Sequence, residues 1–280
     1  MNTQAAILSD VADGVMTITL NRPEAANAVR PDDRDALIAL LGAADADEKV
    51  RVVVLRANGK HFCSGADVGS LAERRAKGEK RVLEPTRRIM NGAQKLVASV
   101  LDCNKPVIAA VHGAATGLGA HVVYASDLVI ATENAYFAES FVKRGLVVDG
   151  GGCYLLPRRI GMQKAKEMAF FGEKLSAAEA FTLGLVNRVV SAADFDATVA
   201  DFAGRLPSRE RLPSQWSECQ SEPRLPPGEL GRSFLHERLD TLRGVVRIRL
   251  DLLRHGLRDE CAGPVGVGGV VEQPFGECDR

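Results

Sequence analysis

Two glycine-bearing turns, each between an apolar run and a predicted helix, are the segments of this sequence best suited to chemistry. They are HFCSGADV (61–68) and VHGAATGLGAH (111–121). Glycine lets backbone N–H groups point outward at the start of a helix, where the helix dipole adds positive potential. Such N–H groups can hold a carbonyl oxygen that becomes negative during a reaction.

The glycines of the second turn also fit a dinucleotide-binding loop, which would indicate a nicotinamide-dependent oxidoreductase. Such a loop normally follows the first strand of its domain, whereas this one comes after two strand-like segments and starts only at residue 111. No tyrosine has a lysine four residues later, as short-chain dehydrogenases require. The oxidoreductase interpretation is therefore disfavoured.

A carboxylate stands on a third glycine turn, in GLVVDGGGCYLLPRRIG (145–161). Asp149 precedes three glycines that open a predicted helix, and an aspartate in such a place often caps the helix N-terminus. The alternative is a carboxylate held among apolar neighbours, where a raised pKa would suit general acid/base catalysis. The residues alone leave both interpretations open.

The elements that must position these turns are alternating strands and helices, which predict an α/β fold with largely parallel strand pairing. The predicted strands are 15–20, 51–57, 105–111, 127–132 and 185–190. The predicted helices are 31–44, 84–102, 119–126, 163–172, 176–184 and 191–206, with a further one opened by the third glycine turn.

Composition excludes several classes of function. Lys plus Arg and Asp plus Glu are both 36, so no net charge favours nucleic acid or an anionic membrane. The sequence shows no secretory signal and no apolar run of the roughly 20 residues that a membrane helix needs, so we expect a cytoplasmic protein. The cysteines and histidines lack zinc-site spacing, so no metal is predicted.

Composition changes near residue 205. No lysine follows Lys174, and residues 205–280 are rich in arginine, proline and glycine. We therefore predict a core over 1–204 and a divergent, poorly ordered segment over 205–280, with one amphipathic helix at about 235–258. A reading-frame shift in the gene would produce such a segment.

Together the three turns resemble the crotonase superfamily, the enoyl-CoA hydratase/isomerase family. NRPEAANA (21–28), KPVIAAV (105–111), FVKRGLVV (141–148) and LSAAEAFTLGLVNRVV (175–190) extend the resemblance over about residues 5–204. It implies a crotonase-type spiral of repeated ββα units that acts on an acyl-CoA thioester. CoA then enters as part of the substrate, no separate cofactor is needed, and the assembly is a homotrimer or hexamer.

The resemblance also implies site residues. The two N–H donors of the oxyanion hole match Ala66 and Leu118. The residues expected to bind the acyl-CoA are Ala25, Ala26, Ala28, Ser64, Gly65, Asp67, Gly117 and Phe141. Ala26 stands where many members carry Lys or Arg.

The catalytic carboxylates depart from the hydratase pattern. Hydratases of the family use two glutamates, and these match His121 and Phe141 here. Asp149 instead matches the isomerase branch, in which one carboxylate moves a proton between C2 and C4 of the acyl chain. We therefore predict an isomerase with Asp149 as proton shuttle. His121 is either a second acid/base or a residue lining the pocket, enoyl-CoA hydratase is the alternative activity, and an inactive, degenerate chain is a second alternative.

Overall fold

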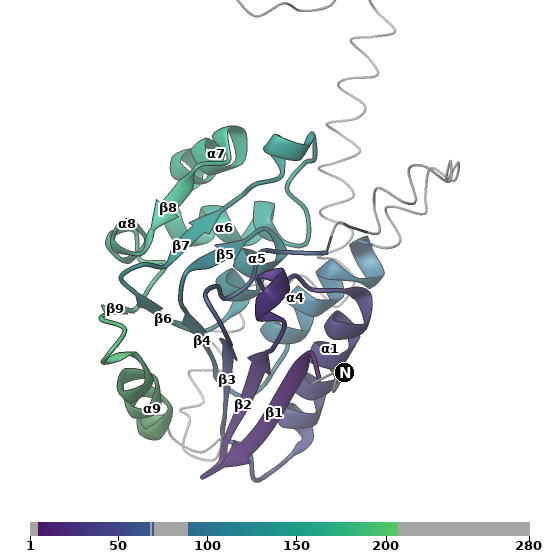
Figure 1. The fold of residues 1–280 in the computed structure, drawn as a ribbon, viewed down its shortest axis with the longest axis vertical. Coiled ribbons are helices and arrows are strands. Elements are labelled where there is room, and N and C mark those ends of the chain that lie inside the picture. Colours follow the sequence, from purple (N-terminus) through teal and green to yellow (C-terminus); the bar gives the residue numbers. More distant parts are fainter. Residues whose placement is uncertain (1–4, 68, 70–88, 207–280) are drawn as a thin grey trace, which may run out of the picture. The chain divides into compact units, whose positions relative to one another are not determined.

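The computed structural model describes residues 5–67, 69 and 89–206. The described residues contain a six-stranded sheet in the order β1-β2-β3-β4-β6-β9, parallel except for the β1–β2 pair, and a three-stranded sheet in the order β5-β7-β8 (Figure 1). The predicted α/β class with largely parallel pairing is confirmed. The C-terminal segment beyond residue 206, with its predicted helix, lies outside the described residues.

The larger sheet consists of β1 (Ile7–Ala12), β2 (Val15–Leu20), β3 (Val52–Ala57), β4 (Val107–Val111), β6 (Leu128–Thr132) and β9 (Arg188–Val190). The smaller sheet consists of β5 (Ala114–Thr116), β7 (Tyr136–Ala138) and β8 (Lys174–Ser176). The α-helices are α1 (Pro31–Ala46), α4 (Ala93–Leu101), α5 (Leu118–Ala125), α6 (Gly152–Ile160), α7 (Met162–Phe171), α8 (Ala177–Thr182) and α9 (Phe195–Arg205). The described residues also form two 3-10 helices, η1 (Pro23–Ala25) and η2 (Val142–Arg144).

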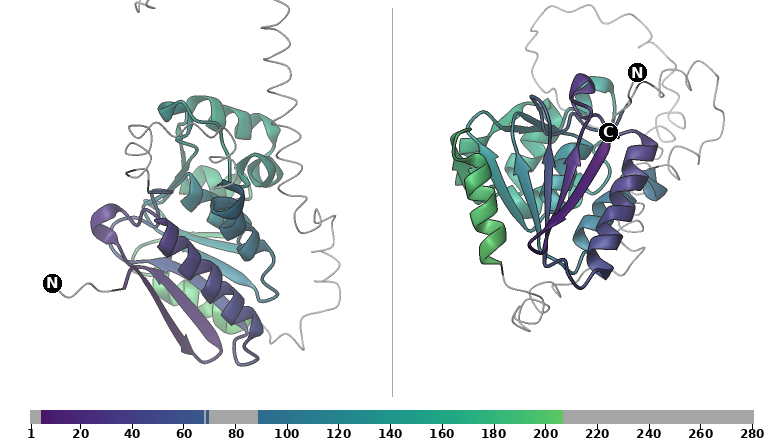
Figure 2. Two further views of the ribbon diagram at one scale, coloured as in Figure 1. Left: turned by 90° about the vertical axis from the view of Figure 1, so that its right-hand side faces the viewer. Right: turned by 60° about the horizontal axis from the view of Figure 1, so that its bottom comes forward.

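Both faces of the larger sheet are covered. Val53 and Leu55 of β3 belong to the core shared with α1, α4 and α5, whereas Val52 and Val54 belong to the core shared with α9. Figure 2 shows α1 and α9 on opposite faces of the sheet. A strand buried on both faces has no polar alternation, which explains the continuous apolar run of this segment.

The repeated unit is a strand of the larger sheet, a short strand of the smaller one and then a helix. β4, β5 and α5 follow one another in this way. β6 and β7 repeat the two strands, because β6 pairs with β4 in the larger sheet and β7 pairs with β5 in the smaller one. β3 is followed by Cys63, which forms an isolated parallel bridge with Ala115 of β5. The chain therefore winds as the expected spiral, and successive turns lie next to one another at the smaller sheet.

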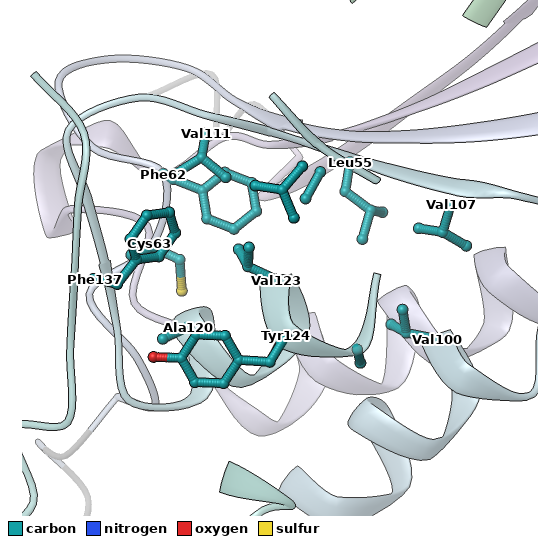
Figure 3. Close-up of a cluster of buried hydrophobic side chains, with 14 of the residues drawn as sticks. Leu55, Phe62, Cys63, Val100, Val107, Val111, Ala120, Val123, Tyr124 and Phe137 are labelled. Atoms are coloured by element: carbon teal, nitrogen blue, oxygen red, sulfur yellow. The ribbon is translucent and has the colours of Figure 1, made fainter. Parts of the chain in front are cut away.

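Helix α5, which ends one turn of this spiral, packs deep in the core. Figure 3 shows Ala120, Val123 and Tyr124 of α5 among the side chains of the buried cluster, which also contains Phe62 and Cys63. Among residues 5–67, 69 and 89–206, no helix combines the length and the apolar character needed to span a membrane.

The first turn of α5 touches the Cys63 backbone directly. A Cβ added to Gly119 would lie 2.6 Å from the Cys63 Cβ and 2.7 Å from its carbonyl oxygen. Because one of these atoms belongs to the backbone, the clash cannot be relieved by a change of side-chain rotamer. A Cβ added to Gly42, in the middle of α1, would have no atom within 4 Å.

Gly119→Ala is therefore expected to lower the free energy of unfolding by about 1–3 kcal/mol, the usual cost of overpacking a core. Gly42→Ala is the matched control and should raise it by about 0.5–1 kcal/mol, because alanine loses less entropy in a helix. Urea denaturation of the two variants measures both values. A stable Gly119→Ala protein would show that α5 does not rest on Cys63.

Candidate active site

The two backbone segments that carry Ala66 and Leu118 lie side by side. The Cys63 carbonyl accepts a hydrogen bond from the Thr116 N–H at 2.9 Å, which aligns the first turn with the second. A Cβ built on Gly65 would lie 3.6 Å from the Leu118 nitrogen. The structure thus brings together the two turns that the sequence placed about 50 residues apart.

Both predicted donors are unused by the fold. Val29 and Ala66 form an isolated parallel β-bridge, whose two hydrogen bonds join Val29 to the neighbours of Ala66. The Val29 N–H donates to the Gly65 carbonyl at 2.8 Å, and the Val29 carbonyl accepts from the Asp67 N–H at 2.9 Å. The N–H of Ala66 therefore points to the opposite side. Leu118 is the first residue of α5, so its N–H has no partner within the helix. In the described part of the chain, neither N–H donates a hydrogen bond.

The turn before α5 requires glycine. Gly117 has φ +52° and ψ −124°, a combination that a residue with a Cβ rarely adopts. A Cβ there would also lie 3.6 Å from the Phe141 ring. Gly117 and Phe141, both predicted to contact the acyl-CoA, are thus neighbours on the same side of the turn.

Arg22 fastens the NRPEAANA loop to the first turn. Its Nη1 donates to the Ala28 carbonyl at 2.9 Å and to Asp33 at 3.1 Å, and its Nη2 donates to Asp67 at 3.3 Å. Burial would raise the pKa of Asp33, but the hydrogen bonds from Arg30 and Arg22 outweigh it and hold that pKa below its usual value. The Asp67 carboxylate is therefore held in an ion pair behind the turn.

The same loop meets the turn through its backbone. Chain direction reverses at Ala26, whose φ is +49°, just after η1 ends at Ala25. The Ala26 carbonyl accepts from the Ser64 N–H at 3.0 Å. The residues predicted to bind the acyl-CoA therefore form a continuous series from the loop, through the first turn, to Gly117 and Phe141.

Cys63, next to the two donors, is not equipped as a nucleophile. Burial raises the pKa of its thiol to about 12, despite a hydrogen bond with the Gly65 backbone that acts in the opposite direction. Only a thiolate attacks a thioester readily, so this side chain stays a neutral packing group. The chemistry of this side of the site rests on backbone atoms.

His121 is completely buried against a carboxylate. Its Nε2 lies 3.1 Å from the Oε2 of Glu139, and neither side chain has any solvent exposure. The imidazole also stacks on Phe141, with ring centroids 5.5 Å apart and planes inclined by 6°. Burial alone would lower the pKa of His121, but the charge and hydrogen bond of Glu139, with the charge of Asp149, outweigh it and raise that pKa.

The glycines of the third turn make room for this imidazole. A Cβ on Gly150 would lie 3.1 Å from His121 Nδ1, and one on Gly152 would clash with Nε2. Helix α6 begins at Gly152 with Gly151 as its N-cap and has no side-chain cap. Asp149 is therefore not the cap residue that one interpretation of the sequence suggested. It is a half-buried residue on the turn that covers His121.

No role was assigned to Glu139 from the sequence. Glu139 directly follows β7, whose Phe137 is buried. Side chains alternate along an extended chain, so residue 139 faces the same side as residue 137, into the core. That alternation was the available signal, although a strand of three residues is too short to be recognised by pattern.

Comparison with known proteins agrees with this architecture. The family model for enoyl-CoA hydratase/isomerase matches residues 10–215. The chain is 40% identical over 187 residues to a protein of Rhodobacter capsulatus named "Probable enoyl-CoA hydratase", covering 67% of this chain and 69% of the relative. It is 37% identical over 207 residues to the 1,2-epoxyphenylacetyl-CoA isomerase of Escherichia coli K12, covering 71% and 74%. A crystal structure of an enoyl-CoA hydratase from Mycobacterium smegmatis matches with a TM-score of 0.66 and 37% identity, covering 72% of this chain and 77% of that one.

The raised pKa of His121 predicts a pH-dependent contribution to stability. The folded protein binds this proton more tightly than the unfolded chain, whose histidine pKa is about 6.5. The contribution is complete below about pH 6.5 and is lost as pH rises through the folded pKa, at about 1.4 kcal/mol for each tenfold difference in proton affinity.

The measurement is the free energy of unfolding in urea between pH 6 and pH 9. We expect Glu139→Gln to remove this component of the decline with pH. Glu133→Gln, an exposed glutamate only six residues earlier, is the matched control and should keep it. Identical pH dependence in all three proteins would contradict the assignment.

Proposed function

The chain belongs to the enoyl-CoA hydratase/isomerase family of acyl-CoA metabolism, and on that premise we propose that it is an enoyl-CoA isomerase with Asp149 as the proton-carrying base. The similar proteins include both hydratases and isomerases. The choice between the two activities therefore has to come from the residues of this chain.

The observation that carries the proposal is the difference in burial between two carboxylates. Glu139 has no exposed surface and its Oε2 is held by His121, whereas Asp149 is half-buried on the covering turn. Hydration needs a water molecule held and activated by acid/base groups that reach the substrate. A single accessible carboxylate is enough for isomerisation, because the group that removes the proton can also return it.

The thioester carbonyl is expected to accept hydrogen bonds from the N–H groups of Ala66 and Leu118. Neither N–H donates a hydrogen bond within the described residues, so we expect little reorganisation as negative charge develops on the oxygen. The N-terminus of α5 adds positive potential at Leu118. This stabilises an enolate and makes the C2 protons of the acyl chain more acidic.

The proton transfer then balances within one residue. Asp149 takes a proton from C2 of a 3-enoyl-CoA, and the electrons of that C–H bond enter the conjugated enolate. The protonated Asp149 returns the proton to C4, so the double bond moves from C3–C4 to C2–C3. CoA arrives with the substrate, and Ala25, Ala26 and Ala28 supply the backbone expected to lie along it.

Phe141 and His121 take the positions where a hydratase of this family carries glutamates. Their ring planes are nearly parallel, so the Phe141 ring stacks on the imidazole of His121. We expect Phe141 to face the acyl chain. His121 has no exposed surface, and we assign it an action on Asp149 rather than on the substrate.

Asp149→Asn is expected to lower kcat for isomerisation of a 3-enoyl-CoA by about 10²- to 10⁴-fold, the usual contribution of a general acid/base. Binding of a saturated acyl-CoA, measured by calorimetry, should be unchanged because the two N–H donors remain. Isomerase activity that survives this substitution would overturn the role of Asp149.

The wild-type protein should also be assayed for water addition to a 2-enoyl-CoA. Hydration faster than isomerisation would replace the proposal with the hydratase alternative. Failure to bind any acyl-CoA would favour the degenerate-chain alternative. Product analysis over a small panel of enoyl-CoAs also defines the acyl chain length.

Gly65→Ala tests the oxyanion hole. The added methyl group would lie 3.0 Å from the Thr116 carbonyl and 3.6 Å from the Leu118 nitrogen, so it should disturb the space between the donors. Loss of one donor costs about 2.7–4 kcal/mol of transition-state stabilisation, a 10²- to 10³-fold fall in kcat.

Gly184→Ala is its matched control. Gly184 also has a positive φ, +83°, but nothing lies within 4 Å of its Cβ position. Because both substitutions strain the backbone, Gly184→Ala should lower the melting temperature by a similar amount to Gly65→Ala. Its kcat should stay close to that of the wild type. Equal activity in the two variants would argue against catalysis by these N–H groups.

A further inference from the structure

Three fully buried polar side chains lie behind the turn that carries Asp149. His121, Tyr124 and Glu139 are each at most 2% exposed. Among the described residues, His121 Nδ1, the Tyr124 hydroxyl and Glu139 Oε1 are buried without a hydrogen-bond partner. Native proteins satisfy nearly all buried polar groups, so a cluster of this kind points to a role beyond packing.

The charge state of the cluster follows from its neighbours. An ionised carboxylate away from water needs a counter-charge. Tyr124 cannot supply one, and burial together with the Glu139 charge raises its pKa well above the usual value. His121 bonds directly to Glu139, and the same carboxylate raises its pKa despite burial. His121 is therefore the neighbour placed to balance a charged carboxylate at Glu139.

Several elements pack around the His121 ring within the described residues. The groups that face it or line the adjoining turn are Glu139 after β7, Tyr124 on α5, Asp149 before α6, Phe141 before η2 and Ala93 on α4. The acidic groups among them are the Glu139 and Asp149 carboxyls and the Tyr124 hydroxyl. The protonation of His121 is thus governed by one carboxylate in direct contact and a second one on the covering turn.

His121 lies directly against the turn that carries Asp149. The atoms nearest to the Cβ positions of Gly150 and Gly152 include atoms of the imidazole. The charge of Asp149 favours the protonated form of His121. Coupling between two sites is reciprocal, so the imidazolium must favour the ionised form of Asp149 by the same free energy.

We propose that Glu139 is a positioning residue that holds His121 as a buried cation beneath the glycine turn, and that this cation keeps Asp149 ionised as the base. The proposal rests on the proposed function of Asp149. Glu139 does not touch the substrate in this arrangement. It acts only through the imidazole, which it bonds at Nε2 while Nδ1 lies toward Gly150.

The sign of one shift separates this role from a structural one. If Glu139→Gln leaves His121 neutral, Asp149 loses a nearby cation and its pKa rises. If the cation survives without Glu139, Asp149 only loses a more distant negative charge and its pKa falls. If Glu139 serves packing alone, glutamine keeps the shape and the pKa of Asp149 does not move.

The test is a pair of NMR titrations on the full-length protein without substrate. Imidazole ¹⁵N shifts, with the His121 signals identified from His121→Gln, report the ring charge. The ¹³Cγ shift of Asp149, identified from Asp149→Asn, reports its carboxyl group. We expect a cationic His121 at pH 7 in the wild type and a neutral ring in Glu139→Gln. In that variant the pKa of Asp149 should be higher by about one unit. Glu133→Gln should match the wild type.

Several results would overturn the proposal. A neutral His121 in the wild type at pH 7 does so even if Glu139→Gln fails to fold. An Asp149 pKa that falls or stays constant in a folded Glu139→Gln protein also does so. The titrations require no turnover, so failure of the isomerase assay would reject the proposed function without deciding the coupling.

The kinetic readout is the pH profile of kcat/KM for the wild type and the two glutamine variants. We expect the acidic limb of Glu139→Gln to move up by about one pH unit, with kcat affected more than KM. Glu133→Gln should keep the wild-type profile. A uniform loss of activity with no displacement of the limb would assign Glu139 a purely structural role.

Discussion

Direct contact between two backbone segments is the constraint on which the rest of this site depends. The first turn of α5 packs at Gly119 against the Cβ and the carbonyl oxygen of Cys63, and residue 119 has no room for a side chain. Hydrogen bonds in parallel register hold the two segments side by side, which brings Ala66 and Leu118 close to each other. Because these donors are backbone atoms, Leu118 can occupy its position without any loss of the N–H group.

The turn that carries Asp149 uses glycine for a different purpose. Gly150 and Gly152 let the covering turn lie directly against the imidazole of His121, where a methyl group would collide with the ring. A histidine in the core of α5 thus requires small residues on the turn above it. The residue type at 121 and the glycines at 150 and 152 form one structural unit, although about 30 residues separate them in the sequence.

The sequence allowed five of the six strands of the larger sheet and most helices to be predicted, because long apolar runs leave clear patterns. The pairing of the two glycine turns was predicted from the resemblance to a known family. β5, β7 and β8 have three residues each, which is too few for alternation to be visible. β1 is an edge strand that is largely exposed, so it lacks an apolar pattern. The Glu139–His121 contact depends on the spiral placing β7 beside α5, and no local pattern encodes it.

The charges proposed for His121, Glu139 and Asp149 explain why an isomerase does not need the two glutamates of a hydratase. Two carboxylates that share a dry site repel each other, which keeps one of them protonated. In the proposed arrangement the His121–Glu139 pair is neutral overall, and the positive member, His121, lies against the turn that carries Asp149. In the proposed reaction Asp149 therefore starts ionised, ready to remove the C2 proton, and no second acid competes to deliver a water molecule. Burying this ion pair costs desolvation free energy. In the proposed arrangement the buried cation also stabilises the ionised form of Asp149 before the substrate binds.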